Sequence, residues 1–323
     1  MAVREWIVGD ETAREMLHRL ERDRPVCRSL APPLHRVPLF PGNVLELTGP
    51  SPSAKTHILM QVAIRSIVPE EYGGSGRMVF FIDLDCRFDV LRLGHLLKHH
   101  LCSYPGLEQK QCNINHLEDD LFVECMTRFR YIRCYNTTEF LATLKTLHDH
   151  IKNETKDQRV GVSTLMIDSI GAFYWSDRAS TFHHGENNRK CFSLQHVSET
   201  VVQEIKKLLR SYPVLIIVTK SHITSDKQFG TDPNWVVSGP ASRGYSSSRD
   251  SSHSTALPRD YLPSVWQKFV THRILLRASG NNPSVGNHQN EPVFTLEWLL
   301  PRLDIIEKFL VTDVRIRFLN MLF

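Results

Sequence analysis

Val44-Leu-Glu-Leu-Thr-Gly-Pro-Ser-Pro-Ser-Ala-Lys-Thr56 is the stretch of sequence that decides the fold. Its first five residues are mostly apolar, and they predict a strand over 44–48. The residues after Thr56 predict a helix, because apolar side chains recur on one face of it: Ile58, Leu59, Val62 and Ala63. A strand, a loop of small residues and prolines, and a helix in this order are typical of a phosphate-binding loop.

The loop Gly49–Thr56 departs by one residue from the pattern G-x-x-x-x-G-K-[ST], whose backbone N–H groups cradle phosphates. Lys55 supplies the positive charge for phosphate, and Thr56 supplies the hydroxyl for Mg²⁺. Ala54 replaces the second glycine, so a methyl group stands where the backbone should approach phosphate, and Pro52 removes one amide donor. The loop therefore predicts either a weakened site for ATP and Mg²⁺ or a former nucleotide loop that now serves as a structural turn. The residues of the predicted site are Gly49, Ser53, Ala54, Lys55 and Thr56.

Two acidic residues follow buried strand patterns and complete the predicted site. Asp168 ends the apolar run 160–168, where a carboxylate would hold the metal shell of a bound Mg²⁺. Asp85 follows the nearly continuous apolar run 78–84, and it is a candidate for orienting a water molecule near a γ-phosphate. An alternative for Asp85 is that it caps the next helix.

The remaining pattern alternates strands with helices, which predicts an α/β fold: a mainly parallel central sheet with helices on both faces. Ligands bind at the carboxyl ends of the strands in such sheets. Further strands are predicted at 128–135, 160–168, 214–219, 265–277, 292–299 and 308–318, and further helices at 90–101, 138–151 and 194–208.

The chain divides into a short N-terminal part and one large core. Residues 1–41 hold a capping-box helix over about 10–22 and a proline-rich linker, and residues 42–323 form the predicted core. Within the core, the polar segment 221–263 has no apolar periodicity and carries four basic and four acidic residues. It is either a functional loop that contacts DNA or a disordered insertion.

Composition excludes several classes of protein. The chain has 323 residues, of which 41% are hydrophobic and 23% charged, and its net charge is +4. These values are typical of a globular protein. The longest apolar runs are about five residues, and the N-terminus has no apolar core of a signal peptide, so neither a membrane span nor secretion is expected.

The metal-binding and redox side chains follow no recognised pattern. The seven cysteines are odd in number and lack Cys-x-x-Cys spacing, so we expect reduced, mostly buried thiols rather than a disulfide framework. His95, His99 and His100 lie close together on one predicted helix. They lack a His-Glu-x-x-His motif, so exposed helix histidines account for them better than a zinc site.

Three segments resemble the core of the RecA-type recombinases: Leu47–Thr56, Phe81–Leu93 and Leu165–Trp175. The third, Leu-Met-Ile-Asp-Ser-Ile-Gly-Ala-Phe-Tyr-Trp, is the most specific. Together with Tyr261–Gln267, it is similar to the eukaryotic paralogues of the strand-exchange recombinase. The resemblance runs from about residue 8 to the end of the chain. It implies a RecA-like P-loop NTPase core that lacks an N-terminal helical DNA-binding domain.

The resemblance also implies a function and a set of partners. It implies a nuclear protein that repairs DNA double-strand breaks by homologous recombination, as an assembly subunit in a hetero-oligomer with other recombinase paralogues. Single-stranded or branched DNA would be contacted through that complex, by the regions 176–188 and 221–263. Active family members carry Glu at the position of Asp85, and a Gln that senses the γ-phosphate at the position of Lys220. The chain is therefore expected to be at most a weak DNA-dependent ATPase.

Two other functions stay open on the sequence. The chain could be a DNA-dependent ATPase active in its own right, in which case ATP turnover would depend on single-stranded DNA. It could also be a P-loop kinase, in which case a small phosphorylated product would form. The neutral count of charges in 221–263 favours weak DNA binding at best, because phosphate neutralisation supplies much of the affinity for single strands.

Overall fold

A computed structural model describes Arg14 and residues 34–104, 114–158, 160–182, 193–221, 260–279, 292–312 and 315–319. Apart from Arg14, the predicted N-terminal helix lies outside these residues, as does nearly all of the polar segment 221–263. The division of the chain at residues 41 and 42 stays a prediction.

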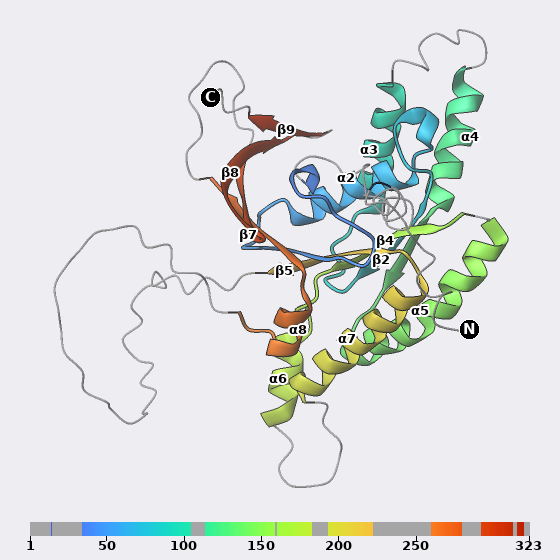
Figure 1. The fold of residues 1–323 in the computed structure, drawn as a ribbon. Helices are drawn as coiled ribbons and strands as arrows, with labels where there is room; N and C mark the ends of the chain where they lie inside the picture. The colour runs from blue at the N-terminus through green and yellow to red at the C-terminus, as the bar shows by residue number, and fades with distance from the viewer. Residues whose placement is uncertain are drawn as a thin grey trace, which may run out of the picture.

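The described residues form a nine-stranded sheet in the order β3-β2-β4-β5-β1-β6-β7-β8-β9 (Figure 1). The strands from β3 to β6 in this order pair in parallel, and the last three continue the sheet with antiparallel pairs. The mainly parallel central sheet predicted from the sequence is therefore confirmed. The strands are β1 (Val44–Gly49), β2 (Met78–Asp83), β3 (Phe129–Arg133), β4 (Val162–Asp168), β5 (Leu215–Ser221), β6 (His272–Ala278), β7 (Val293–Leu300), β8 (Arg302–Val311) and β9 (Ile316–Leu319).

Helices cover both faces of the parallel part of the sheet (Figure 1). On one face lie α2 (Lys55–Ile67), α3 (Val90–Cys102) and α4 (Ile114–Thr127), and on the other lie α5 (Thr137–Gln158), α7 (Leu194–Ser211) and α8 (Ser264–Phe269). The remaining helical elements are α6 (Tyr174–Phe182) and the 3₁₀ turns η1 (Leu34–Arg36) and η2 (Glu70–Tyr72). No helix among the described residues is long and apolar enough to cross a membrane.

The central strands are buried on both faces, which explains their continuous apolar runs. Every residue of β1 and β2 is buried, and so are all residues but one of β4 and of β5. Side chains of one face, such as Phe81, pack in a core with α2 and α3, whereas those of the other face, such as Ile216, pack with α5 and α7. Parallel strands with helices on both faces bury all their side chains in this way.

Two of the predicted closing strands differ from the structure. The strand expected over 265–277 is wrong in its first half, because 264–269 form α8 and only 272–278 form β6. Leu262, Trp266 and Val270 are buried at a spacing of four residues, which is helical periodicity. The single strand expected over 308–318 is also wrong. The end of β8 and β9 lie in this range and pair antiparallel, and the backbone N–H of Thr312 donates to the carbonyl oxygen of Arg315.

The chain packs on the core before β1 begins. Leu34 and Leu39 are fully buried in the same core as α2. The guanidinium of Arg36 contacts Glu307 Oε1 of β8 at 2.6 Å. These contacts fix the residues that precede β1 beside the antiparallel part of the sheet.

The described cysteines are Cys86, Cys102, Cys125 and Cys134, and all four are free thiols. Cys125 and Cys134 are buried, whereas Cys86 and Cys102 are exposed. The expectation of mostly buried thiols therefore holds for only half of them. Burial raises the pKa of Cys125 to about 11, which keeps that thiol protonated and unreactive at neutral pH.

Candidate nucleotide-binding site

The loop Gly49–Thr56 joins the carboxyl end of β1 to the first turn of α2, as the sequence predicts. Gly49 is required there by packing, because an added Cβ would lie 2.1 Å from the carbonyl oxygen of Leu276 in β6. Ser53 is buried, and its side chain points back toward the loop, since its Oγ lies 2.9 Å from Lys55 Nζ. The loop therefore packs closely against β6, beside the carboxyl end of β1.

Ala54 adopts a left-handed backbone conformation, with φ 61° and ψ 16°, at the N-cap of α2. Glycine adopts this conformation without penalty, whereas a residue with a Cβ loses about 1–2 kcal/mol. The replacement noted in the sequence therefore has a backbone cost in addition to the crowding of a phosphate. That crowding itself stays a prediction.

The ammonium group of Lys55 lies inside the loop. It donates to the carbonyl oxygens of Gly49 and Pro50 at 2.9 and 3.0 Å and to Ser53 Oγ. Burial lowers the pKa of Lys55 to about 8, against the opposing effect of the carboxylates of Asp168 and Asp85. Lys55 therefore remains mostly charged at neutral pH, and its role toward a phosphate group stays a prediction.

Thr56 and Asp168 form the hydroxyl–carboxylate pair that a bound Mg²⁺ requires. Thr56 Oγ1 donates to Asp168 Oδ2 at 2.7 Å, and the hydroxyl of Thr219 in β5 donates to Oδ1 of the same carboxylate. Burial raises the pKa of Asp168, and the two hydroxyl donors oppose that rise. Thr219 was not predicted, although its place follows from the pairing of β4 with β5, in which Ile167 lies beside Val218.

Asp85 follows β2, which pairs with β4, so it lies near Asp168 at the carboxyl ends of these two strands. Its backbone N–H lies 3.3 Å from the carbonyl oxygen of Asp168. Burial raises the pKa of Asp85, and the nearby charge of Asp168 adds to the rise. The alternative role as a helix cap is filled by Asp89, whose Oδ1 accepts from the backbone N–H groups of Leu91 and Arg92. Asp85 is therefore available to the site, and its role toward water stays a prediction.

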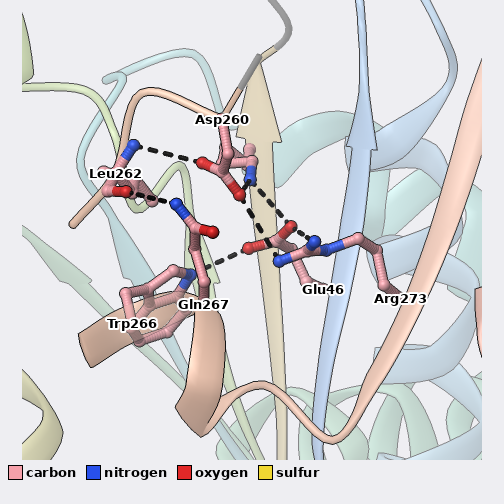
Figure 2. Close-up of polar contacts among 7 residues, drawn as sticks. Glu46, Asp260, Leu262, Trp266, Gln267 and Arg273 are labelled. Carbon is pink, nitrogen blue, oxygen red and sulfur yellow. Dashed lines mark hydrogen bonds and ion pairs between the residues drawn. The ribbon is translucent and has the colours of Figure 1, made fainter. Parts of the chain in front are cut away.

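The structure places Lys220 in a buried cluster of charges with Glu46, Asp260 and Arg273, and Figure 2 shows these last three side chains close together. Lys220 Nζ lies 2.9 Å from Glu46 Oε1 and 2.8 Å from Asp260 Oδ2. Arg273 Nε lies 2.8 Å from Glu46 Oε1, and Trp266 Nε1 donates to Glu46 Oε2 at 2.8 Å. The predicted role of Lys220 as a replacement for a γ-phosphate sensor stays a prediction. Its charge is shared with two carboxylates.

The residues of the loop fit a nucleotide with Mg²⁺. Helix α2 has no side-chain cap at its N-terminus, so its first N–H groups are suited to bind an anion. Lys55 supplies the cation for phosphate, and Thr56 with Asp168 supplies the oxygen ligands that Mg²⁺ prefers. The methyl group of Ala54 and the missing N–H of Pro52 weaken the fit without removing these groups.

The histidines noted on the sequence lie on α3. His95 and His99 are exposed and His100 is half-buried. Burial lowers the pKa of His100, with the nearby guanidinium of Arg65 as the next cause. Within the part of the chain that the structure describes, no three His, Cys, Asp or Glu side chains lie close enough to hold a metal ion.

Comparison with known proteins gives the relatives of the chain. The DNA repair protein XRCC2 homolog of Arabidopsis thaliana is 45% identical over 340 residues, which cover 97% of this chain and 89% of that protein. The DNA repair protein XRCC2 of Mus musculus is 29% identical over 268 residues, with 82% of this chain and 83% of that protein covered. No protein-family model matches the chain.

More distant relatives agree with the fold. The DNA repair protein RAD51 homolog 3 of Cricetulus griseus is 30% identical over 125 residues, or 38% of this chain and 34% of that protein. The DNA repair and recombination protein RadA of Methanoculleus marisnigri is 22% identical over 236 residues, or 72% of this chain and 66% of that protein. With the mainly parallel α/β sheet, these relatives confirm a RecA-like core. The chain belongs to the XRCC2 family of DNA repair proteins.

Proposed function

We propose that the protein acts in the nucleus in the repair of DNA double-strand breaks by homologous recombination, as an assembly subunit of a hetero-oligomer of recombinase paralogues. The observation that carries the proposal is the placement of two surfaces at opposite ends of the sheet. β3 is the outermost strand at one end, and the residues that precede β1 are fixed beside β8 at the other.

These two surfaces suit a head-to-tail assembly. No strand among the described residues pairs with the outer edge of β3, so its backbone groups are suited to pair with another chain, and Tyr131 and Ile132 in this strand are half-buried. Leu34 is buried in the same core cluster as Phe309 of β8, so a segment that leaves the core at Leu34 would start away from β3. Head-to-tail contacts join different surfaces of successive subunits. A complex with a fixed number of subunits therefore leaves one such surface unpaired at each end.

The experiment is capture of recombinase paralogues by the full chain and by a variant that lacks residues 1–33. Leu34 and Leu39 are the first buried apolar residues that the structure describes, so this truncation spares the described core. We expect the full chain to capture a paralogue at micromolar concentration and the truncated chain to lose most of that capture. A full chain that stays monomeric and captures none would refute the proposal. Equal capture by both chains would refute the role of the N-terminal segment.

We propose that nucleotide binding is weak and that hydrolysis by the isolated chain is low or absent. Support comes from the left-handed Ala54 and from Pro52 in a loop that otherwise keeps Lys55, Thr56 and Asp168. Lys55→Ala should abolish ATP binding, measured by equilibrium titration. The same variant should keep paralogue capture, because the sheet edge is unaltered. Brisk hydrolysis by the wild type would favour the alternative, a DNA-dependent ATPase active in its own right.

We propose that single-stranded or branched DNA meets the complex near α6. The first region expected to contact DNA, 176–188, begins inside this helix. Trp175 is 55% exposed, and the guanidinium carbon of Arg178 lies 5.7 Å from the centre of its indole ring. An exposed indole beside an arginine suits base stacking, which contributes about 1–3 kcal/mol per base. Trp175→Ala in the purified complex should weaken binding of a fluorescent single strand, whereas Tyr135→Ala, which removes an exposed aromatic ring that lies outside α6, should not.

A further inference from the structure

Residues Asp260–Pro263, here called the strap, pass beside the carboxyl end of β5 and lead into α8 (Figure 2). Asp260 uses both carboxylate oxygens. Oδ2 lies 2.8 Å from Lys220 Nζ and 3.5 Å from Arg273 Nη2, and Oδ1 accepts from the N–H of Leu262 at 3.1 Å. The carbonyl oxygen of Leu262 in turn accepts from Gln267 Nε2 of α8 at 2.8 Å. The strap is thus tied to the sheet at one end and to α8 at the other.

The charges that hold the strap are balanced only when Asp260 is in place. Glu46 is fully buried and the side chain of Lys220 is 5% exposed, so both are removed from water. Arg273 shares Glu46 with Lys220. Two acids therefore meet two bases, and removal of Asp260 would leave one positive charge uncompensated among buried groups. An uncompensated buried charge is strongly unfavourable, so the cluster favours the strap in its observed position.

The next residue of the strap touches the segment that starts α6. An added Cβ on Gly171 would lie 2.1 Å from the hydroxyl oxygen of Tyr261, so only glycine admits this ring. The rings of Tyr261 and Tyr174 meet edge to face, with their centres 4.8 Å apart. Leu262 and Pro263 line the same apolar pocket as Phe173 and Asp177 of this region. Movement of the strap would therefore remove packing from the first turn of α6.

We propose that the Lys220–Asp260 ion pair is a built-in latch: it holds the strap on the sheet, and through Tyr261 it fixes the start of α6 whether or not nucleotide is bound. The ammonium group of Lys55 contacts Gly49, Pro50 and Ser53 of its own loop, whereas that of Lys220 contacts Glu46 and Asp260. The latch is therefore built from charges of the protein that are separate from the phosphate loop. It goes beyond the proposed assembly function and does not depend on it.

Hydrogen–deuterium exchange of the full chain tests the latch. In the wild type, amides of residues 170–182 should exchange at the same rate with and without MgATP. Asp260→Asn, which keeps the shape and removes the charge, should speed exchange in 170–182 and 260–269 at least about tenfold. Exchange in β2 and α3 should stay unchanged. Protection of α6 that appears only with MgATP would overturn the proposal.

Two glycine variants test the contact of Tyr261 with the start of α6 without changing the charges of the latch. Gly171→Ala should displace Tyr261 and speed exchange in α6 while the ion pair stays intact. Gly161→Ala is the matched control, because the nearest atom to its added Cβ is Arg77 Nη1 at 3.7 Å, an ordinary contact. Unchanged exchange of α6 in both Asp260→Asn and Gly171→Ala would overturn the proposal.

A double variant keeps the proposal testable if Asp260→Asn speeds exchange throughout the chain. Lys220→Met with Asp260→Leu removes both charges of the latch and leaves Glu46 paired with Arg273 at 2.8 Å. The latch predicts a protected core with fast exchange confined to α6 and the strap. A protected core with a fully protected α6 would show that packing alone holds the strap, which overturns the proposal.

Discussion

Ala54→Gly should stabilise the protein, although glycine usually destabilises a helical protein where it replaces alanine. The backbone of Ala54 is left-handed, with φ 61°. Glycine relieves the strain of about 1–2 kcal/mol that a Cβ causes in this conformation. It also frees the unfolded chain, which costs about 0.4–1 kcal/mol. The midpoints of the two ranges leave a net gain of about 0.8 kcal/mol.

Chemical denaturation and thermal unfolding measure this gain. For a chain of this length, about 0.8 kcal/mol corresponds to a rise in Tm of about 1 °C. Ala142→Gly is the matched control, because Ala142 is exposed in the second turn of α5, where the backbone is right-handed. The same substitution there should destabilise the protein by about 1 kcal/mol. The two variants should therefore shift the unfolding free energy in opposite directions.

Ala54→Gly should also bind ATP more tightly, because the loop loses the methyl group that is predicted to crowd a bound phosphate group. One recovered charge-assisted hydrogen bond contributes about 1.5–3 kcal/mol, so the gain in affinity should be about tenfold or more. Equilibrium titration with MgATP measures it. If Ala54→Gly destabilises the chain as much as Ala142→Gly does, the strain argument is wrong. If stability rises with no change in affinity, the crowding argument alone is wrong.

Four further predictions concern Lys55, Thr219 and Lys220. Burial lowers the pKa of Lys55 from 10.5 to about 8, so between these pH values the unfolded chain binds more protons than the folded chain. The unfolding free energy should therefore rise with pH across that window. Lys55→Met should remove this rise in denaturation curves measured from pH 7 to 10. ATP affinity of the wild type should fall above pH 8 as the ammonium loses its proton. Thr219→Val removes a donor to the buried Asp168, so it should cost about 1–3 kcal/mol of stability and weaken Mg²⁺-dependent ATP binding, whereas Thr219→Ser should restore both; equal loss in the two variants would contradict the hydrogen bond. Lys220→Gln breaks a buried ion pair and should cost about 3–5 kcal/mol, with ATP turnover remaining low; a large DNA-stimulated gain in turnover from this change would contradict the prediction.

The sequence alone determined the class of fold and the core of the candidate site. Strand and helix patterns repeat over a few residues, so β1, α2, β2 and β4 could be located from local periodicity. The phosphate loop could be located because its chemistry is contiguous: Lys55 and Thr56 follow the loop directly. Asp168 could be added because carboxyl ends of parallel strands meet at one edge of a sheet.

Only the tertiary structure decided which distant residues meet at that edge. Thr219 reaches Asp168 because β5 lies beside β4, and no spacing in the sequence states that neighbourhood. Lys220 forms ion pairs with Glu46 and Asp260, which are 174 residues before it and 40 residues after it. A buried charge needs an opposite charge close by, and only the fold decides which residue supplies it. Local periodicity fixes the elements, whereas strand order and burial decide the partners of each polar group.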